Sequence, residues 1–133
     1  MFSDPEVAFL RSQRLGRIAT VSPDGQPDVA PVGFEFDGRD FYVGGIQMTR
    51  TLKYRNAQAN PRVSFVVDDV ESVEPWKPRG VKVHGRAIIV DRDGPSGRGP
   101  YLRIAPETHW SWGIEGPVFQ QGKPVLKKAK HSR

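Results

Sequence analysis

Apolar and polar residues alternate along much of the chain, in short runs that are separated by turn residues. The clearest run spans 80–91, where valine, alanine and isoleucine positions alternate with Lys82, His84 and Arg86. This period of two is typical of a strand that is buried on one face. Comparable runs predict further strands at 17–22, 28–36, 40–44, 62–68, 101–105 and 109–114, with a hairpin turn at 23–25.

The N-terminal segment carries a helix signal instead. Ser3 and Glu6 form a capping box, in which each side chain can accept a hydrogen bond from the other residue's backbone N–H. Gly16 suits the position just past a helix end. We therefore expect a first helix over 4–15.

Six or seven short strands joined by hairpin turns, together with two small helices, predict a mainly β domain of the α+β class, a six- to seven-stranded antiparallel barrel. Pro27 and Pro31 predict that the second strand is an edge strand or carries a bulge, because proline cannot donate to a sheet ladder. The 133 residues suit one domain, which we place at 1–115. The basic tail at 116–133 is expected to be disordered and dispensable for the fold.

The distribution of charge argues against a nucleic-acid partner. The formal net charge is +5, but residues 1–115 hold as many Lys and Arg as Asp and Glu, so the whole excess lies in the tail. No helix-turn-helix, zinc-finger or aromatic RNA-reading pattern accompanies it. We expect the folded part to bind no nucleic acid.

Other classes of chemistry are excluded by what the sequence lacks. The chain has no cysteine, and His84, His109 and His131 have no partner at metal-ligand spacing, so we expect neither a disulfide nor a metal site. No apolar run is long enough to cross a bilayer, and the first residues lack the pattern of a signal peptide. We therefore expect a cytoplasmic protein without a membrane partner.

Residues 40–68 carry the strongest candidate chemistry. A predicted strand is followed by two glycines and by a helix whose expected N-cap is Thr49 and which stops at the Asn-Pro pair at 60–61. No acidic residue lies between Arg50 and Arg62. The free N–H groups of such a helix start, with Arg50 and Lys53, could hold an anion. The alternative is a solvated basic face of a surface helix.

Trp110 and Trp112 are a second candidate. They lie two residues apart on a predicted strand, so they share one face. That face could stack on a planar ligand, or it could belong to the core or to an interface. The acidic residues of 68–74 could hold a cation, but loop acids are usually solvated.

Four segments in the same order resemble the pyridoxamine 5'-phosphate oxidase-like split β-barrel flavoproteins, most of all the actinobacterial branch that uses the deazaflavin coenzyme F420. These segments are 17–27, 31–34, 49–56 and 60–63, and 111–115 is similar to the ending of one subgroup. The resemblance covers 3–115.

The resemblance implies a homodimer that binds two cofactors at its interface. It implies that Arg50 and Lys53 hold the cofactor phosphate with Thr49 as a hydroxyl donor, and that Trp110 or Trp112 closes the partner's site. The ring system is expected on the backbone of the first two strands. The full set of expected cofactor-binding residues is Ile18, Ala19, Thr20, Val21, Val32, Gly33, Phe34, Met48, Thr49, Arg50, Lys53, Arg55 and Trp112.

The function that the resemblance implies is an F420-dependent oxidoreductase that reduces an activated double bond of a small organic substrate by hydride transfer. The alternatives are an FMN-binding flavoprotein of the same fold and a non-enzymatic cofactor-binding protein. Vitamin B6 oxidase activity is not expected, because the consecutive Ser-Arg-Lys and the Arg-Leu-His motifs of those enzymes have no counterpart. No catalytic side chain is assigned, although Tyr42, Tyr54 or His84 could donate a proton.

The choice between F420 and FMN depends on the group attached beyond the phosphate. F420 continues into a glutamate chain, so a protein that binds it needs further cations. Arg55 and Arg62 are candidates, as are the basic residues of 77–79. These cations favour F420 as the cofactor, with FMN as the alternative.

Overall fold

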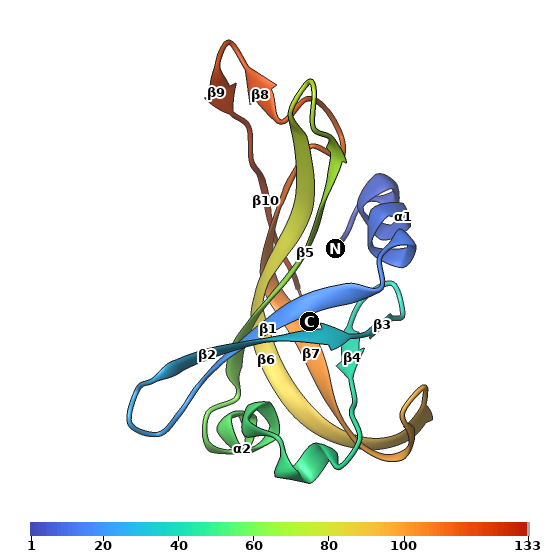
Figure 1. Ribbon diagram of the computed structural model, residues 1–133, viewed down its shortest axis with the longest axis vertical. Helices are drawn as coiled ribbons and strands as arrows, with labels where there is room; N and C mark the ends of the chain where they lie inside the picture. The colour runs from blue at the N-terminus through green and yellow to red at the C-terminus, as the bar shows by residue number, and fades with distance from the viewer. Residues whose placement is uncertain (133) are drawn as a thin grey trace.

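The structure, a computed structural model, describes residues 1–132. Two short helices and one 3-10 turn accompany ten strands (Figure 1). In chain order the elements are α1 (Asp4–Ser12), β1 (Leu15–Val21), β2 (Pro27–Gly33), β3 (Glu35–Phe36), β4 (Phe41–Val43), η1 (Met48–Arg50), α2 (Leu52–Ala59), β5 (Arg62–Ser72), β6 (Lys77–Gly94), β7 (Gly97–Trp112), β8 (Phe119–Gln120), β9 (Lys123–Pro124) and β10 (Lys127–Lys130).

The main sheet is antiparallel and closes on itself. Its order is β2-β1-β5-β6-β7-β4-β3, and β10 pairs with β7 beside this path. The strands at the two ends of the path, β2 and β3, are separated in sequence by Phe34 alone. Because one residue joins both ends, the sheet must curl into a barrel, and the barrel is split where β2 and β3 are not paired. The predicted antiparallel split barrel is confirmed, although the sheet has eight strands rather than six or seven.

Two strand boundaries differ from the predictions, but these two differences cancel in number, so the additional strand of the sheet is β10, from the tail. The predicted strand 28–36 is divided at Phe34 into β2 and β3, and the predicted strands 101–105 and 109–114 are one strand, β7. The register between β6 and β7 shifts at His84/Gly85, opposite Pro106. A Cβ at Gly85 would lie 2.4 Å from the carbonyl oxygen of Ala105, so only glycine allows the strands to approach this closely.

Aromatic side chains fill the barrel. Phe41 and Phe65 are fully buried with ring centroids 4.9 Å apart, and Phe34 packs against both at 5.8 and 5.4 Å. The alternation predicted for the strands appears in β5 and β6, whose inward residues include Val63, Phe65, Val67, Val81 and Val83. Burial of this apolar surface is the main stabilising contribution, at about 25 cal/mol per Å².

One boundary of each helix differs from the predictions. The capping box is confirmed, since the Ser3 N–H donates to Glu6 Oε1 at 2.9 Å and the Glu6 N–H donates to Ser3 Oγ at 3.3 Å. However, α1 ends at Ser12, because Gln13 is already extended and Leu15 starts β1. The expected N-cap of α2 at Thr49 is wrong: Thr51 caps this helix by accepting from the Tyr54 N–H at 3.3 Å.

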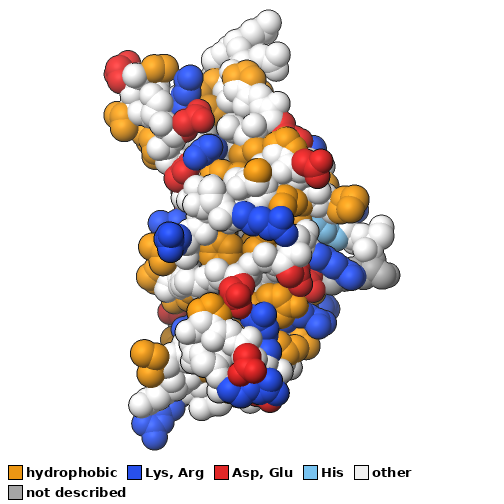
Figure 2. Space-filling view, turned by 90° about the vertical axis from the view of Figure 1, so that its right-hand side faces the viewer, with side chains coloured by type: hydrophobic (Ala, Val, Ile, Leu, Met, Phe, Trp, Pro, Cys, Tyr) orange, Lys and Arg blue, Asp and Glu red, His pale blue; other side chains and the backbone are white. Residues whose placement is uncertain are grey.

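The second strand lies at an edge, as its two prolines predict. β2 pairs only with β1, so the backbone groups on its other side are not used by the sheet. Figure 2 shows Lys and Arg side chains interspersed with Asp and Glu over one face of the molecule, as the balanced charge of 1–115 suggests.

The expectation of a disordered tail is wrong for the part of it that forms β10. Lys127–Lys130 pairs with β7 over Ser111–Thr108, and the His131 N–H donates to the Glu107 carbonyl at 2.9 Å. β8 and β9 form a separate two-stranded sheet that projects at one end of the molecule (Figure 1). The tail therefore extends the main sheet.

A first prediction concerns this tail. Truncation after Gly122 removes β10 and the side chain of His131, so we expect the free energy of unfolding to fall by about 1–3 kcal/mol, the cost of leaving buried polar groups unpaired. Urea denaturation measures this change. His131→Ala should reproduce part of the loss, and Ser132→Ala, the matched control at an exposed neighbour, should not. An unchanged stability after truncation contradicts a structural role for β10.

Candidate functional site

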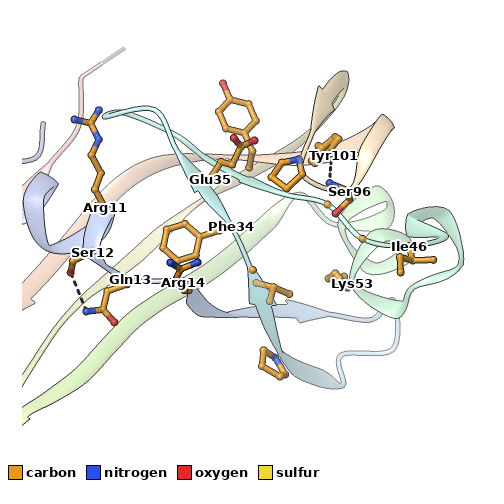
Figure 3. Close-up of a pocket in the computed structure, with 17 residues that line it drawn as sticks. Arg11, Ser12, Gln13, Arg14, Phe34, Glu35, Ile46, Lys53, Ser96 and Tyr101 are labelled. Carbon is orange, nitrogen blue, oxygen red and sulfur yellow. Dashed lines mark hydrogen bonds between the residues drawn. The ribbon is translucent and has the colours of Figure 1, made fainter.

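A cavity of about 760 Å³ lies at the corner where β2 passes into β3 (Figure 3). The end of α1, the β2–β3 corner, the segment after β4, α2 and the β6–β7 turn all contribute to it. Its lining residues are Arg11, Ser12, Gln13, Arg14, Pro31, Val32, Gly33, Phe34, Glu35, Tyr42, Gly44, Gly45, Ile46, Lys53, Pro95, Ser96 and Tyr101. Four of the predicted cofactor-binding residues meet here: Val32, Gly33, Phe34 and Lys53.

The wall formed by β4 and β7 is tightly packed. A Cβ at Gly44 would lie 2.3 Å from the Tyr101 ring, so the backbone approaches this ring as closely as glycine allows. The Arg92 guanidinium lies over Tyr42 at 4.2 Å and over Tyr101 at 5.4 Å, and it pairs with Glu35 at 2.6 Å. This network fixes both aromatic side chains and neutralises the cavity's one acidic side chain.

Tyr42 is the only candidate proton donor that lines this cavity. Its hydroxyl donates to Asp37 Oδ2 at 3.1 Å. Burial raises the pKa of Tyr42, and the hydrogen bond to Asp37 raises it further. Tyr54 is buried in the core, and His84 lines a different cavity. Tyr42 is therefore held protonated, with its proton directed at Asp37.

The basic residues predicted for the cofactor site do not line one cavity. Lys53 is half-buried in the cavity, whereas Arg50 and Arg55 are exposed outside it. The 3-10 turn η1 ends at Arg50 and α2 starts at Leu52, so Arg50 and Lys53 do not belong to one helix. The single helix start expected to carry both residues is therefore not found, although their binding roles remain predictions.

Two further predicted residues line a neighbouring cavity of about 340 Å³. Thr49 is exposed there, while Met48 is buried and also packs in the core. Gly45, Ile46 and Tyr101 line both this cavity and the main one, so the two adjoin.

The predicted residues of β1 lie elsewhere. Ala19, Thr20 and Val21 line a smaller cavity of about 280 Å³ that also includes Arg62, while Ile18 is buried in the core. Thr20 Oγ1 accepts a hydrogen bond from Asn56 Nδ2 at 3.0 Å, which joins β1 to α2. The structure therefore separates the β1 residues from the β2 residues with which they were grouped.

The two tryptophans share a face, as their spacing predicts, and both are half-buried rather than part of the core. Trp110 is flanked by Lys82 at 4.5 Å and Lys128 at 5.6 Å. Trp112 packs on Gly80 and lines a cavity of about 240 Å³ beside the tail. Neither ring reaches the main cavity of its own chain.

A buried polar chain joins the two ends of the protein, and no sequence pattern predicted it. His109 Nε2 lies 3.1 Å from both carboxylate oxygens of Glu6, and both side chains are fully buried. His109 Nδ1 lies 2.7 Å from His131 Nε2. The Phe2 ring covers both imidazoles at 4.3 and 4.8 Å. Sequence spacing could not predict these hydrogen-bonded side chains, because Glu6 and His109 are 103 residues apart.

The charge of Glu6 determines which atom carries the proton in its hydrogen bond with His109. Burial alone would raise the pKa of Glu6, but hydrogen bonds from His109, Ser111 and the Ser3 backbone lower it to about 2. An ionised carboxylate only accepts, so His109 Nε2 carries the donated proton.

Comparison with known proteins identifies the family. A family model described as pyridoxamine 5'-phosphate oxidase matches residues 3–117. The chain belongs to the pyridoxamine 5'-phosphate oxidase family. The resemblance found in the sequence is thereby confirmed.

Members and structural neighbours of this family give the class of reaction. A protein of Streptomyces rimosus subsp. rimosus named 5a,11a-dehydrotetracycline/5a,11a-dehydrooxytetracycline reductase is 40% identical over 123 residues, which cover 88% of this chain and 87% of that protein. A solved structure named F420 reductase is 26% identical, with a TM-score of 0.65, and the match covers 81% of this chain and 98% of that one. These names support an oxidoreductase.

A third comparison bears on the fold alone. A conserved hypothetical protein of Mycobacterium tuberculosis superimposes with a TM-score of 0.71 at 24% identity, over 92% of this chain and 94% of that one. Within residues 1–132, neither helix is long and apolar enough to span a membrane. No group of three His, Cys, Asp or Glu side chains in the same range is placed to hold a metal ion.

A second prediction concerns Glu6. Its pKa is about 2 in the folded protein against an ordinary 4.5, so its contribution to stability is full above pH 4.5 and is lost as the pH falls toward 2. We expect Glu6→Gln to lower the free energy of unfolding at pH 7 by about 1–3 kcal/mol and to flatten the loss of stability between these pH values. Urea denaturation at pH 7 and pH 3 measures both effects.

The matched control is Glu74→Gln, at an exposed acid that makes no ion pair within residues 1–132. It should leave the stability and its pH dependence unchanged. If the Glu6 and Glu74 variants respond alike, the buried pair does not determine the acid sensitivity.

Proposed function

We propose that this chain is an F420-dependent reductase that transfers a hydride to an activated carbon–carbon double bond of a planar organic substrate. The observation that carries the proposal is the main cavity, which places Lys53 and the backbone of Val32–Phe34 around one space of about 760 Å³. A cavity of this size suits a tricyclic ring together with a substrate. The names of the Streptomyces relative and of the F420 reductase structure support the same chemistry.

The residues present fit a deazaflavin cofactor. Lys53 makes no ion pair within residues 1–132, so its charge is available to a phosphate in the cavity. β2 is an edge strand whose outer N–H and C=O groups are not used by the sheet. An edge of this kind can pair with the alternating donors and acceptors of a pyrimidinedione ring. Gly44 and Gly45 line the opposite wall, where the Gly44 backbone packs on the Tyr101 ring.

A reduced deazaflavin supplies a hydride when it is bound. The chain's part is to bind and orient. Lys53 anchors the anionic end, the edge of β2 sets the plane of the ring, and Tyr42 and Tyr101 form a rigid wall against which the substrate can pack. Because the Tyr42 proton is committed to Asp37, we assign Tyr42 a positioning role.

A third prediction distinguishes F420 from FMN. Lys53→Ala should weaken the binding of both cofactors by about 1.5–3 kcal/mol, the scale of a hydrogen bond to a charged group. Arg55→Ala should weaken F420 alone, by about 0.2–1 kcal/mol, because Arg55 is exposed and can meet only the glutamate chain. Fluorescence titration with F420 and FMN measures these affinities.

Arg39→Ala is the matched control for these titrations, since Arg39 is exposed and lies outside the cavity lining. It should change neither affinity. FMN binding at least as tight as F420 binding overturns the assignment in favour of the flavin-binding alternative.

Turnover separates an enzyme from a non-enzymatic cofactor-binding protein. Oxidation of reduced F420 should accelerate when 5a,11a-dehydrooxytetracycline or another conjugated enone is added with the protein. Tight cofactor binding without any acceleration across a panel of enones and quinones would leave the carrier function as the better account.

We also propose that the protein is a homodimer with the cofactor at its interface. Trp112 is only half-buried, and Val29 on the edge strand β2 is 66% exposed. These features suit a surface that is covered by a second copy. In a symmetric dimer the partner's Trp112 could reach the cavity that it does not reach in its own chain.

The fourth prediction tests this assembly. Light scattering should return about twice the chain mass of 14.9 kDa. Val29→Lys should shift the protein toward the monomer, because a buried charge at an interface is costly. Val73→Lys, at a similarly exposed apolar residue on the turn between β5 and β6, is the control. A wild-type monomer under native conditions contradicts the proposal.

A further inference from the structure

We infer that Arg11 and Arg14 form a second anion-binding subsite in the main cavity, which recognises an acidic group, a carboxylate or an enolate, on the organic substrate. The assignment to the substrate rests on the proposed function, since it needs the cofactor phosphate at Lys53. The binding of an anion by the two arginines follows from the cavity alone. Neither arginine was among the residues that the sequence pattern selected.

The first step is the fixed position of the segment that carries the two arginines. Gln13 Nε2 donates to Asp69 Oδ2 at 2.8 Å and to Ser12 Oγ at 3.2 Å, which ties the end of α1 to β5. Leu15 pairs with Gly33 in the β1–β2 ladder, and a Cβ at Gly33 would lie 3.9 Å from the Arg14 carbonyl oxygen. Arg14 is therefore held beside the β2–β3 corner that lines the cavity.

The second step is the charge of the cavity. Its charged lining residues are Arg11, Arg14, Lys53 and Glu35, and Glu35 is paired with Arg92 at 2.6 Å. Neither Arg11 nor Arg14 makes an ion pair within residues 1–132. The cavity thus presents three cations that no acid of the described chain compensates, and such a cleft concentrates anions.

The third step is the separation of these cations. Figure 3 shows Lys53 near Ile46 on one side and Arg11 on the other, with Phe34 and Arg14 between them. With a phosphate at Lys53 and the ring along Val32–Phe34, the cofactor's glutamate chain leaves from the phosphate, away from the ring. Arg14, beside Phe34, is then at the ring end of the cavity, where the substrate lies, and Arg11 lies farther along the same side with its guanidinium beside Gly38 of the β3–β4 turn.

The chemistry of arginine defines the ligand. A guanidinium is planar and binds two oxygens at once, so it matches a carboxylate or the two oxygens of an ionised 1,3-dicarbonyl group. An acidic enone would be oriented by this contact at one end while its double bond meets the ring. The subsite is therefore expected to select acidic substrates over neutral ones of the same shape.

The experiment first uses a pair of probes without cofactor. 8-Anilinonaphthalene-1-sulfonate carries an anionic group, and N-phenyl-1-naphthylamine has the same ring system without it. We expect the double variant Arg11→Ala/Arg14→Ala to weaken the sulfonate probe by about tenfold or more in a fluorescence titration, and to leave the neutral probe within about twofold. Arg39→Ala, the control outside the cavity, should affect neither. Equal binding of the sulfonate by wild type and double variant overturns the inference.

A second measurement identifies the source of the anion. With 3-benzoylacrylate and its methyl ester as substrates, the double variant should raise KM about tenfold for the acid alone, with the dissociation constant of F420 unchanged. A loss of F420 affinity instead would assign the arginines to the glutamate chain and overturn the substrate assignment. Arg14→Lys in the Arg11→Ala background should restore part of the discrimination, and thermal melting checks that each variant is folded.

The two proposals fail in different ways. A protein that does not bind F420 defeats the proposed function, and the probe titration still decides whether the arginines bind an anion. A protein that binds F420 and oxidises its reduced form with the substrate, but shows no preference for the acid, defeats only the subsite.

Discussion

The closure of the sheet at Phe34 is the constraint on which the rest of the structure depends. The two ends of the sheet are joined by this one residue, so the path of every other strand must bring β3 back beside the end of β2. Phe34 anchors the corner by packing on Phe41 and Phe65 inside the barrel. The same corner cannot complete a continuous ladder, and the main cavity opens there. Fold and candidate site thus have a common cause.

The buried chain of Glu6, His109 and His131 is the second long-range constraint. A carboxylate without access to water is tolerated only when its hydrogen bonds are satisfied, and here an imidazole and a backbone N–H supply them. Because the same carboxylate completes the capping box, the start of α1, the end of β7 and the residue after β10 are positioned together. This arrangement favours one placement of the tail over others.

Much of the fold could be predicted because its signals are local. The capping box, the alternation in β6 and the prolines of the edge strand β2 each depend on residues close in sequence. The cap at Thr51 was not predicted, because the local pattern did not indicate the separate turn η1 that precedes it, whose Met48 is buried in the core. Among the residues that line the main cavity, Lys53 was predicted from the cationic helix start and the end of β2 from the family resemblance. Arg11 and Arg14 were not, since only the closed barrel brings α1 to that corner.

The chain that joins Glu6 to His131 also bears on how the protein is made. A ribosome releases the N-terminal helix long before the last residues of the chain have been added. Until then His109, which binds the Glu6 carboxylate, lacks its own partner His131, and the carboxylate can remain hydrated. Final burial of the first helix must therefore wait until the segment through His131 has been synthesised and has paired with β7.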